Sequence, residues 1–195
     1  MTSRQATTEA TRMKLIETAD RLIKLHGYEN VSVEDITDAS GVAKGTFYRH
    51  FKRKEDIILA LSQTHLSSVT AQIDHVTDTS PKVGIRNYLV SFMEVVKRSD
   101  VELTRQWIRY IVLAPDSDHK WSNDYQPFAK MLEKLVKAGM LSVETPVADL
   151  AQLLFTQVYG VVLTWCLAPE EIDPVDQMKR FCDIQLASLL SQYYV

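Results

Sequence analysis

A short segment, residues 43–51, places several polar side chains at helical spacing. The outward side of such a helix would carry Lys44, Thr46, Tyr48, Arg49 and His50. A cation, a hydroxyl, a phenol and an imidazole can donate hydrogen bonds to phosphate oxygens and to the edges of bases. Gly45 has no side chain, so the backbone there can approach a binding partner closely. These residue types predict a helix that binds nucleic acid.

The elements that must position this helix have the pattern of a helix-turn-helix over residues 32–51. A first helix is expected from Val33 to Ser40, and the hydroxyl of Ser32 can cap its start. Gly41 suits the tight turn because glycine adopts positive φ at little cost. The second helix runs from about residue 43 to residue 51. The apolar residues that hold the pair together are Val33, Ile36, Ala39, Val42, Phe47 and Phe51.

The segment VSVEDITDASGVAKGTFYRHFKRK, residues 31–54, resembles the DNA-binding signature of the tetracycline-repressor (TetR) family. That signature reads roughly as a hydroxyl residue, Ile, a small residue, then GV-x-KGT-x-Y-x-HF and a nearby Lys. This chain supplies Ser32, Ile36, Ala39, Gly41, Val42, Lys44, Gly45, Thr46, Tyr48, His50, Phe51 and Lys54 in that order. The resemblance is strong over about residues 8–61, and beyond them only length and helix pattern agree.

The resemblance implies a role for each matching residue. Lys44 and Thr46 would lie at the mouth of the major groove, and Tyr48 and His50 would contact phosphates. The resemblance also implies contacts by Ser32 and Lys54, each of which lies at the start of a helix. Both would bind phosphates, helped by the positive ends of the helix dipoles.

Apolar residues recur at helical spacing along nearly the whole chain, which predicts an all-α fold of about nine helices. The expected helices are about residues 8–26, 33–40, 43–51, 54–76, 81–98, 100–113, 123–138, 146–165 and 175–189. By the resemblance, residues 8–54 form a three-helix DNA-binding domain with the motif at 32–51. Residues 55–195 would form a helical ligand-binding and dimerisation domain.

Charge is distributed unevenly although the whole chain carries a formal net charge of -3. The first 54 residues have more basic than acidic side chains, and the rest is acidic, which suits a protein with one end on phosphates. Cys166 and Cys182 have no ligand spacing and are expected to be buried, reduced thiols. No metal, cofactor, secretory signal or membrane span is expected, because no apolar run approaches eighteen residues; a cytoplasmic location is expected.

The last two long helices are the candidates for a dimer contact, because one recognition helix reads only half of a site. The expected interface residues are Leu154, Val158, Val161 and Trp165 on one helix and Met178, Cys182, Leu186 and Leu189 on the other. These stripes could pair with their symmetry mates as a four-helix bundle, which is how the family dimerises. The alternative is that they are core within one chain.

The middle helices are rich in bulky side chains that could line a cavity for a small molecule. The expected lining residues are Phe92, Met93, Trp107, Tyr110, Trp121, Tyr125, Phe128, Met131, Phe155 and Tyr159. For any one of them, ordinary core packing is the alternative, since aromatic residues at helical spacing serve both purposes. The resemblance implies that a pocket exists, and it leaves the ligand open.

Together these features predict a ligand-responsive transcriptional repressor that binds a palindromic operator as a homodimer. Ligand binding would release it by shifting a population between two conformations. An activator of the same fold is an alternative, because the motif does not encode the sign of regulation, and a protein-binding helical adaptor is another. An enzyme is not expected, since the chain has no Gly-rich phosphate loop, nucleophile elbow or HExxH motif.

Overall fold

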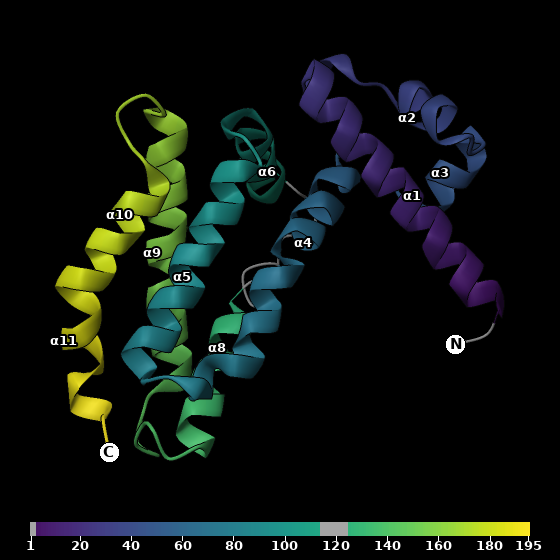
Figure 1. The fold of residues 1–195 in the computed structure, drawn as a ribbon. Coiled ribbons are helices and arrows are strands. Elements are labelled where there is room, and N and C mark those ends of the chain that lie inside the picture. Colours follow the sequence, from purple (N-terminus) through teal and green to yellow (C-terminus); the bar gives the residue numbers. More distant parts are fainter. Residues whose placement is uncertain (1–2, 114–124) are drawn as a thin grey trace.

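A computed structural model of the chain describes residues 3–113 and 125–195 (Figure 1). The fold is all-α, as predicted; within the described residues no strand forms, and one isolated antiparallel bridge joins Leu141 to Tyr194. Trp121, expected to line a pocket, lies outside the described residues. The N-terminal helices form a small body at one end, and the remaining helices pack as a bundle beside it.

The small body consists of α1 (Ser3–His26), α2 (Val33–Ser40) and α3 (Lys44–His50), with a 3₁₀ turn, η1 (Tyr28–Asn30), after α1. Helix α1 begins at Ser3, earlier than the predicted residue 8. The prediction missed residues 3–7 because their sequence carries no core-facing apolar pattern. Gly27 and Gly41 end α1 and α2 with φ of 78° and 64°. Both glycines thus occupy the left-handed region that other residues rarely adopt.

The start of α2 is fixed by a capping box. Ser32 Oγ accepts a hydrogen bond from the Asp35 amide at 3.1 Å, and Asp35 Oδ2 accepts one from the Ser32 amide at 2.7 Å. Helix α3 is held from inside by Phe47, which is fully buried and stacks on Phe51 with ring centroids 5.4 Å apart. The outward residues of α3 therefore have a fixed orientation.

The bundle contains α4 (Asp56–Ala71), α5 (Pro81–Arg98), α6 (Val101–Leu113), α8 (Gln126–Lys137) and α9 (Val147–Leu167). The predicted helix through Val76 is wrong over residues 72–76, because α4 ends at Ala71 and a 3₁₀ segment, η2 (Gln72–Asp78), follows. Ile73 and Val76 are still buried there, so the apolar spacing predicted the burial of these side chains correctly but not the type of helix that carries them.

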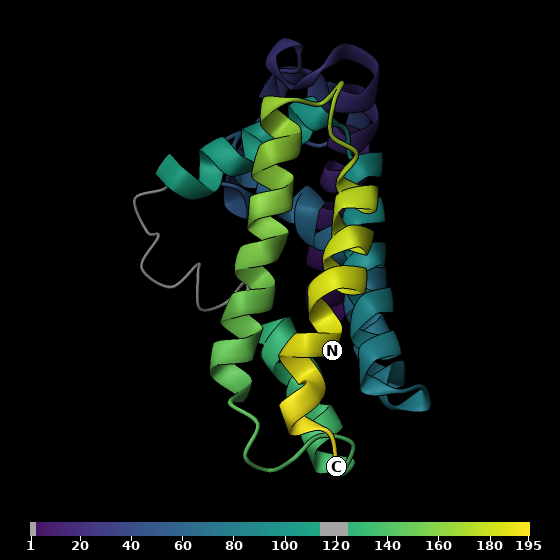
Figure 2. The same ribbon diagram turned by 90° about the vertical axis from the view of Figure 1, so that its left-hand side faces the viewer.

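The predicted ninth helix is divided into shorter pieces. These are α10 (Pro174–Phe181), a π-helical turn, η4 (Cys182–Leu186), α11 (Ala187–Leu190) and a final 3₁₀ turn, η5 (Ser191–Tyr193). The π turn inserts an extra residue into the winding and shifts the helical face after Phe181. Figure 2 shows α10 and α11 running beside α9 on one side of the bundle.

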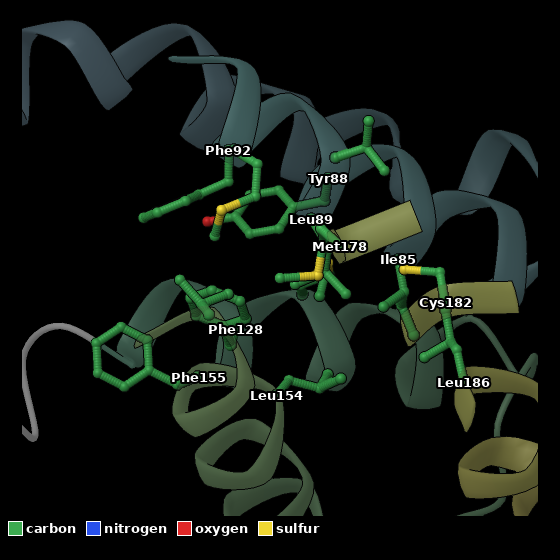
Figure 3. Packing of buried hydrophobic residues seen from close by; sticks show 14 of the residues in the cluster. Ile85, Tyr88, Leu89, Phe92, Phe128, Leu154, Phe155, Met178, Cys182 and Leu186 are labelled. Atoms are coloured by element: carbon green, nitrogen blue, oxygen red, sulfur yellow. The ribbon is translucent and has the colours of Figure 1, made fainter. Parts of the chain in front are cut away.

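Two hydrophobic cores correspond to the small body and the bundle. The first contains the apolar faces of α1 to α3 together with Ile57, Ile58 and Leu61 of α4. The second joins η2, α5, α8, α9 and α10 around a group of buried aromatic and sulfur-containing side chains (Figure 3). Trp107 of α6 packs against both cores. Helices α4 and α6 therefore connect the two cores.

Helix α9 departs from the expectation that no segment could span a membrane. By length and composition alone it is long and apolar enough to do so, although it contains no unbroken run of eighteen apolar residues. Half of its most apolar window is buried against the rest of the chain, and the core helix of a soluble protein passes the same test. A run of consecutive apolar residues was thus too strict a criterion.

Both cysteines are free and buried, as predicted. Burial raises the pKa of the Cys182 thiol to about 11, and it raises the pKa of Cys166 as well. Within the part of the chain that the structure describes, no group of three or more His, Cys, Asp or Glu side chains could hold a metal ion.

Candidate nucleic-acid interface and interior cavity

Helix α3 presents a continuous polar surface to solvent. Lys44, Gly45, Tyr48 and Arg49 are exposed, and Thr46 and His50 are partly buried. Tyr48 is 48% exposed, and its ring rests edge-on against the buried Phe47 at 5.5 Å. The phenol is thus held outward by a fixed anchor. The five side chains predicted to point outward, and Gly45, are all at least partly exposed.

Three of these side chains, Lys44, Thr46 and Arg49, already have intramolecular partners. Lys44 forms a short ion pair with Glu34 of α2, and this contact raises the pKa of Lys44 and lowers that of Glu34. Arg49 Nη2 donates to Thr46 Oγ1 at 3.0 Å. Both contacts are solvent-exposed, so either cation can exchange its partner for a phosphate at little cost.

Ser32 and Lys54 are more strongly engaged than the sequence suggested. The Ser32 hydroxyl belongs to the capping box, which also lowers the pKa of Asp35 through the hydrogen bond from Ser32 Oγ. Lys54 Nζ donates to the Tyr28 carbonyl at 2.7 Å and lies 4.0 Å from the centroid of the Tyr28 ring. Desolvation lowers the pKa of Lys54. Lys54 therefore ties the end of the motif to the turn after α1.

Gly45 differs from the turn glycine, Gly41, in what a side chain would meet. A Cβ at either position would have no atom within 4 Å, so both face open space. Only Gly41 has a positive φ. Neither the packing nor the backbone conformation of this chain therefore requires a glycine at position 45. The absence of a side chain there leaves helix backbone uncovered in the middle of the polar surface.

An apolar cavity of about 240 Å³ lies between α4, α5, α8 and α9. A smaller cavity of about 40 Å³ adjoins it toward α6 and shares Ser62, Leu66, Phe92 and Trp107 with it. Aromatic rings form much of the wall: Phe128 contacts Tyr88 at 5.3 Å and Phe155 at 5.5 Å (Figure 3). None of the described lining residues is Lys, Arg, Asp or Glu.

The predicted pocket residues separate into four groups. Phe92, Trp107, Phe128 and Phe155 line the cavities, whereas Met93 and Met131 are fully buried in the core and do not. Tyr159 stacks on Phe155 and Trp107 behind the wall, and Tyr125 packs against the core. Tyr110 lies elsewhere: its hydroxyl donates to Asp56 at 3.2 Å in a polar cleft beside η1. Tyr110 and the two methionines therefore do not line the two cavities described above.

Sequence reasoning missed the polar part of the wall. Ser62 and His65 of α4, Ser99 after α5 and Thr104 of α6 line the smaller cavity. Small hydroxyl residues within helices carry no pattern that separates a cavity wall from a solvent face, so no signal for them existed. His65 did stand out, because it occurs within the apolar stripe of the helix after the motif.

The predicted dimer residues are mostly buried inside one chain. Leu154, Met178, Cys182 and Leu186 point into the bundle core (Figure 3). Val158, Val161 and Trp165 are buried there as well, and only Leu189 is partly exposed. A side chain whose surface is already covered cannot supply a further contact, so the alternative of intrachain core holds for these residues.

A different stripe of α9 faces outward. Leu153, Thr156, Gly160, Leu163 and Leu167 are all exposed and follow one another at alternating spacings of three and four residues. The three leucines are 55%, 47% and 74% exposed, and Ile184 in the neighbouring η4 is 73% exposed. This spacing is that of the contact positions of a helix that packs along another helix.

Known proteins resemble this chain both in the motif and along most of its length. The family pattern described as bacterial regulatory proteins, tetR family, matches residues 15–61. The chain is 24% identical over 196 residues to the HTH-type transcriptional regulator TtgR of Pseudomonas putida, covering 93% of this chain and 92% of that one.

Solved structures give the same result for the fold. A tetR-family transcriptional regulator from Mesorhizobium loti superposes with a TM-score of 0.68 at 20% identity, covering the whole of both chains. The Thermus thermophilus repressor FadR, solved with lauroyl-CoA, gives 0.73 at 18% identity over 92% of this chain and 95% of that one. Residues 15–61 thus carry the DNA-binding motif of the tetR family of helix-turn-helix transcriptional regulators, and the whole chain has the all-α fold of these relatives.

Proposed function

We propose that the protein is a repressor that binds a palindromic operator as a homodimer and is released by a small molecule. The observation that carries this proposal is the outward surface of α3. Its cation, hydroxyl, phenol and imidazole groups surround a bare glycine, and Phe47 fixes their direction from inside. A rigid polar helix with an unobstructed centre suits entry into a major groove.

Within this proposal, Thr46 and Lys44 contact base edges, and Tyr48, Arg49 and His50 contact phosphates. Lys44 exchanges Glu34 for DNA, which the exposed ion pair permits. Ser32 and Lys54 act chiefly by fixing the motif, and Ser32 adds the amide end of α2 near the backbone of the duplex.

The homodimer forms through the outward stripe of α9 with Ile184. A twofold axis beside α9 would bring two copies of this stripe together, since an isologous contact joins a surface to itself. Gly160 in its middle has no neighbouring atom within 4 Å of an added Cβ, which lets a second helix approach closely. These are the two helices from which the sequence predicted a dimer contact. The proposed contact, however, uses their exposed faces and not the predicted ones.

The effector occupies the two adjoining cavities, which lie between α4, α5, α6, α8 and α9. Because the described walls are aromatic and aliphatic with a few hydroxyls, one imidazole and the amide of Gln63, we propose an uncharged, largely apolar ligand. The relative FadR was solved with lauroyl-CoA, which is a ligand of that protein; the walls described here offer no cation to pair with its phosphates.

Helix α4 transmits the binding event. Its first half, with Ile57, Ile58 and Leu61, belongs to the N-terminal core, while Leu59, Ser62 and Leu66 line the cavity. A ligand that prefers a shifted position of α4 would move both recognition helices off the spacing of successive major grooves, about 34–36 Å. A preference of about 10⁴-fold would reverse occupancy from 99:1 to 1:99.

Selection of bound duplexes from random sequence tests the proposal. The expected result is a palindromic sequence bound by two chains, whose complex is dissociated by at least one uncharged aromatic compound in a metabolite screen. A transcription assay on that operator then gives the sign of regulation, because a repressor lowers transcription and an activator raises it. Recovery of no common sequence would overturn the proposal.

A further inference from the structure

His65 of α4 joins three helices at the boundary between the two cores. Its Nε2 lies 3.2 Å from Asp20 Oδ1 of α1, and its Nδ1 lies 2.9 Å from the hydroxyl of Ser99, the residue after α5. The side chain of His65 is only 19% exposed. Asp20 Oδ1 is buried and has no hydrogen-bond partner, so the imidazole is the polar group that faces it. His65 and Ser99 also line the smaller cavity.

The chemistry of these groups allows two hydrogen-bond patterns. A carboxylate only accepts, so the imidazole nitrogen that faces Asp20 carries a hydrogen in both of them. If His65 is neutral, Nδ1 accepts the hydroxyl hydrogen of Ser99. If His65 is charged, Nδ1 donates to Ser99 Oγ, and the hydroxyl hydrogen is free to bond the Val95 carbonyl, which lies 3.0 Å away. One proton thus changes the hydrogen bond between His65 and Ser99 and, at the same time, the charge that the imidazole presents to Asp20 of α1.

The surroundings isolate this proton from other charges. From α1, Asp20 faces His65, and its other oxygen pairs with Lys24 at 2.6 Å. The cavity residues contributed by α5 and α6 are Phe92, Val95, Val96, Leu103, Thr104 and Trp107, and those of α4 are Ser62 and Leu66. Among the described residues of that wall no other side chain is an acid or a base. The charge of His65 therefore acts chiefly on Asp20.

We propose that His65 is the positioning residue that couples the cavity to the DNA-binding helices through the chain Ser99–His65–Asp20. This inference rests on the proposed function and specifies how its ligand site is regulated. A ligand that bonds Ser99 or His65 changes whether Nδ1 accepts or donates, and with it the charge that His65 of α4 presents to Asp20 of α1. Protonation of His65 acts on the same chain without a ligand.

The backbone next to Ser99 has an unusual conformation. Asp100, which follows Ser99 and precedes α6, has a φ of 76°, a left-handed conformation that aspartate adopts at a cost. Thr104 binds the Asp100 carbonyl through its hydroxyl at 2.7 Å and its amide at 3.1 Å, which holds that conformation in place. Ser99 thus adjoins the left-handed joint between α5 and α6, so its hydrogen bonds lie where these two helices meet.

The test uses operator affinity without a ligand. Asp20 and Ser99 lie on separate helices and meet only through His65, so their substitutions should interact only while His65 is present. We expect the losses of affinity in Asp20→Asn and Ser99→Ala to be non-additive by at least about threefold, and to become additive in a His65→Gln background. Thermal melting of each variant confirms that it is folded.

A pH profile gives the second readout. Between about pH 5.5 and 8, where histidines titrate, the ratio of operator Kd between His65→Gln and wild type should change at least fivefold. Taking the ratio removes the contribution of His50, which both proteins share. His65→Asn, which keeps a group near Ser99 but cannot reach Asp20, should give the same flattened profile and replaces His65→Gln if that variant does not fold.

The matched control is His75→Gln. His75 also pairs with a carboxylate, Asp78 at 3.1 Å, but its side chain is 78% exposed on η2, away from both helices. Its ratio to wild type should stay constant with pH. Additive losses in the wild-type background, or a pH-independent ratio for His65→Gln, would overturn the coupling while leaving the repressor proposal intact. If wild type binds no operator at any pH, the proposed function itself fails.

Discussion

At the scale of residues, we expect Gly41 to matter for folding and Gly45 to matter for DNA binding. Both face open space, yet Gly41 alone needs its positive φ. We therefore expect Gly41→Ala to lower the free energy of unfolding by about 1–2 kcal/mol, because an alanine in the left-handed region is strained. Urea unfolding followed by circular dichroism measures this loss.

Gly45→Ala should have the opposite profile. The substitution meets no atom and adds a helix-favouring residue, so stability should stay the same or rise slightly. Operator affinity should fall by about tenfold or more, because the added methyl group would separate α3 from the groove. Fluorescence anisotropy with a labelled duplex measures the affinity. Unchanged affinity would mean that α3 does not enter the groove at this point.

The capping box makes a pH-dependent prediction. Asp35 has its pKa lowered in the folded protein by the hydrogen bond from Ser32, so its stabilising effect is complete above the pKa of an unfolded aspartate, about 3.9. The effect is lost as the pH falls through the lowered pKa. Ser32→Ala should therefore lower Tm by about 2–4 °C at pH 7 and have a smaller effect in acid. An effect that does not change with pH would mean that Ser32 acts apart from Asp35.

Residue identities in the motif could be predicted because each one has a local cause. Ser32 caps the helix that follows it, Gly41 turns the chain, and Phe47 is the apolar anchor of a short helix, so α2 was predicted with its observed bounds. Pocket residues had no such cause. Met93 and Phe92 are neighbours in one helix, and only their packing against distant helices decides which one lines a cavity.

At the scale of elements, α9 shows why the sequence assigned a buried face of this helix to a dimer contact. Its inward stripe through Leu154 and Val158 and its outward stripe through Leu153 and Leu163 are both apolar. Periodicity identifies an apolar stripe but cannot tell whether the same chain or a second one covers it. The π turn at Cys182 was equally beyond prediction, since it arises where the last helix packs on α5.

Substitution of the outward stripe tests the dimer. Leu163→Glu should convert the protein from dimer to monomer, because two carboxylates would meet across the twofold contact and lie in an apolar surface. Sedimentation equilibrium measures the mass. The matched control is Leu25→Glu, since Leu25 is a leucine of α1 that is 66% exposed and lies outside the stripe. Dimers that persist in Leu163→Glu would place the interface elsewhere.

At the scale of the whole molecule, two cores share α4 and α6, and this arrangement gives a binding event in one core a route to the other. Ile58 and Leu61 pack into the N-terminal core, and Leu66 lines the cavity less than two turns away. Domain boundaries from the sequence, residues 8–54 and 55–195, cut the chain just before α4. In the structure, that helix belongs to both cores.

The most direct measurement is the binding of purified protein to its selected duplex over a range of salt concentrations. We expect two chains per duplex, an affinity at least about 10³-fold above that for a scrambled sequence, and a log–log slope that reports several released counterions. Tyr48→Ala should reduce this affinity by about 1–3 kcal/mol without changing the dimer. A monomeric protein that shows no preference for the selected duplex at low salt would contradict a dimeric, operator-binding repressor.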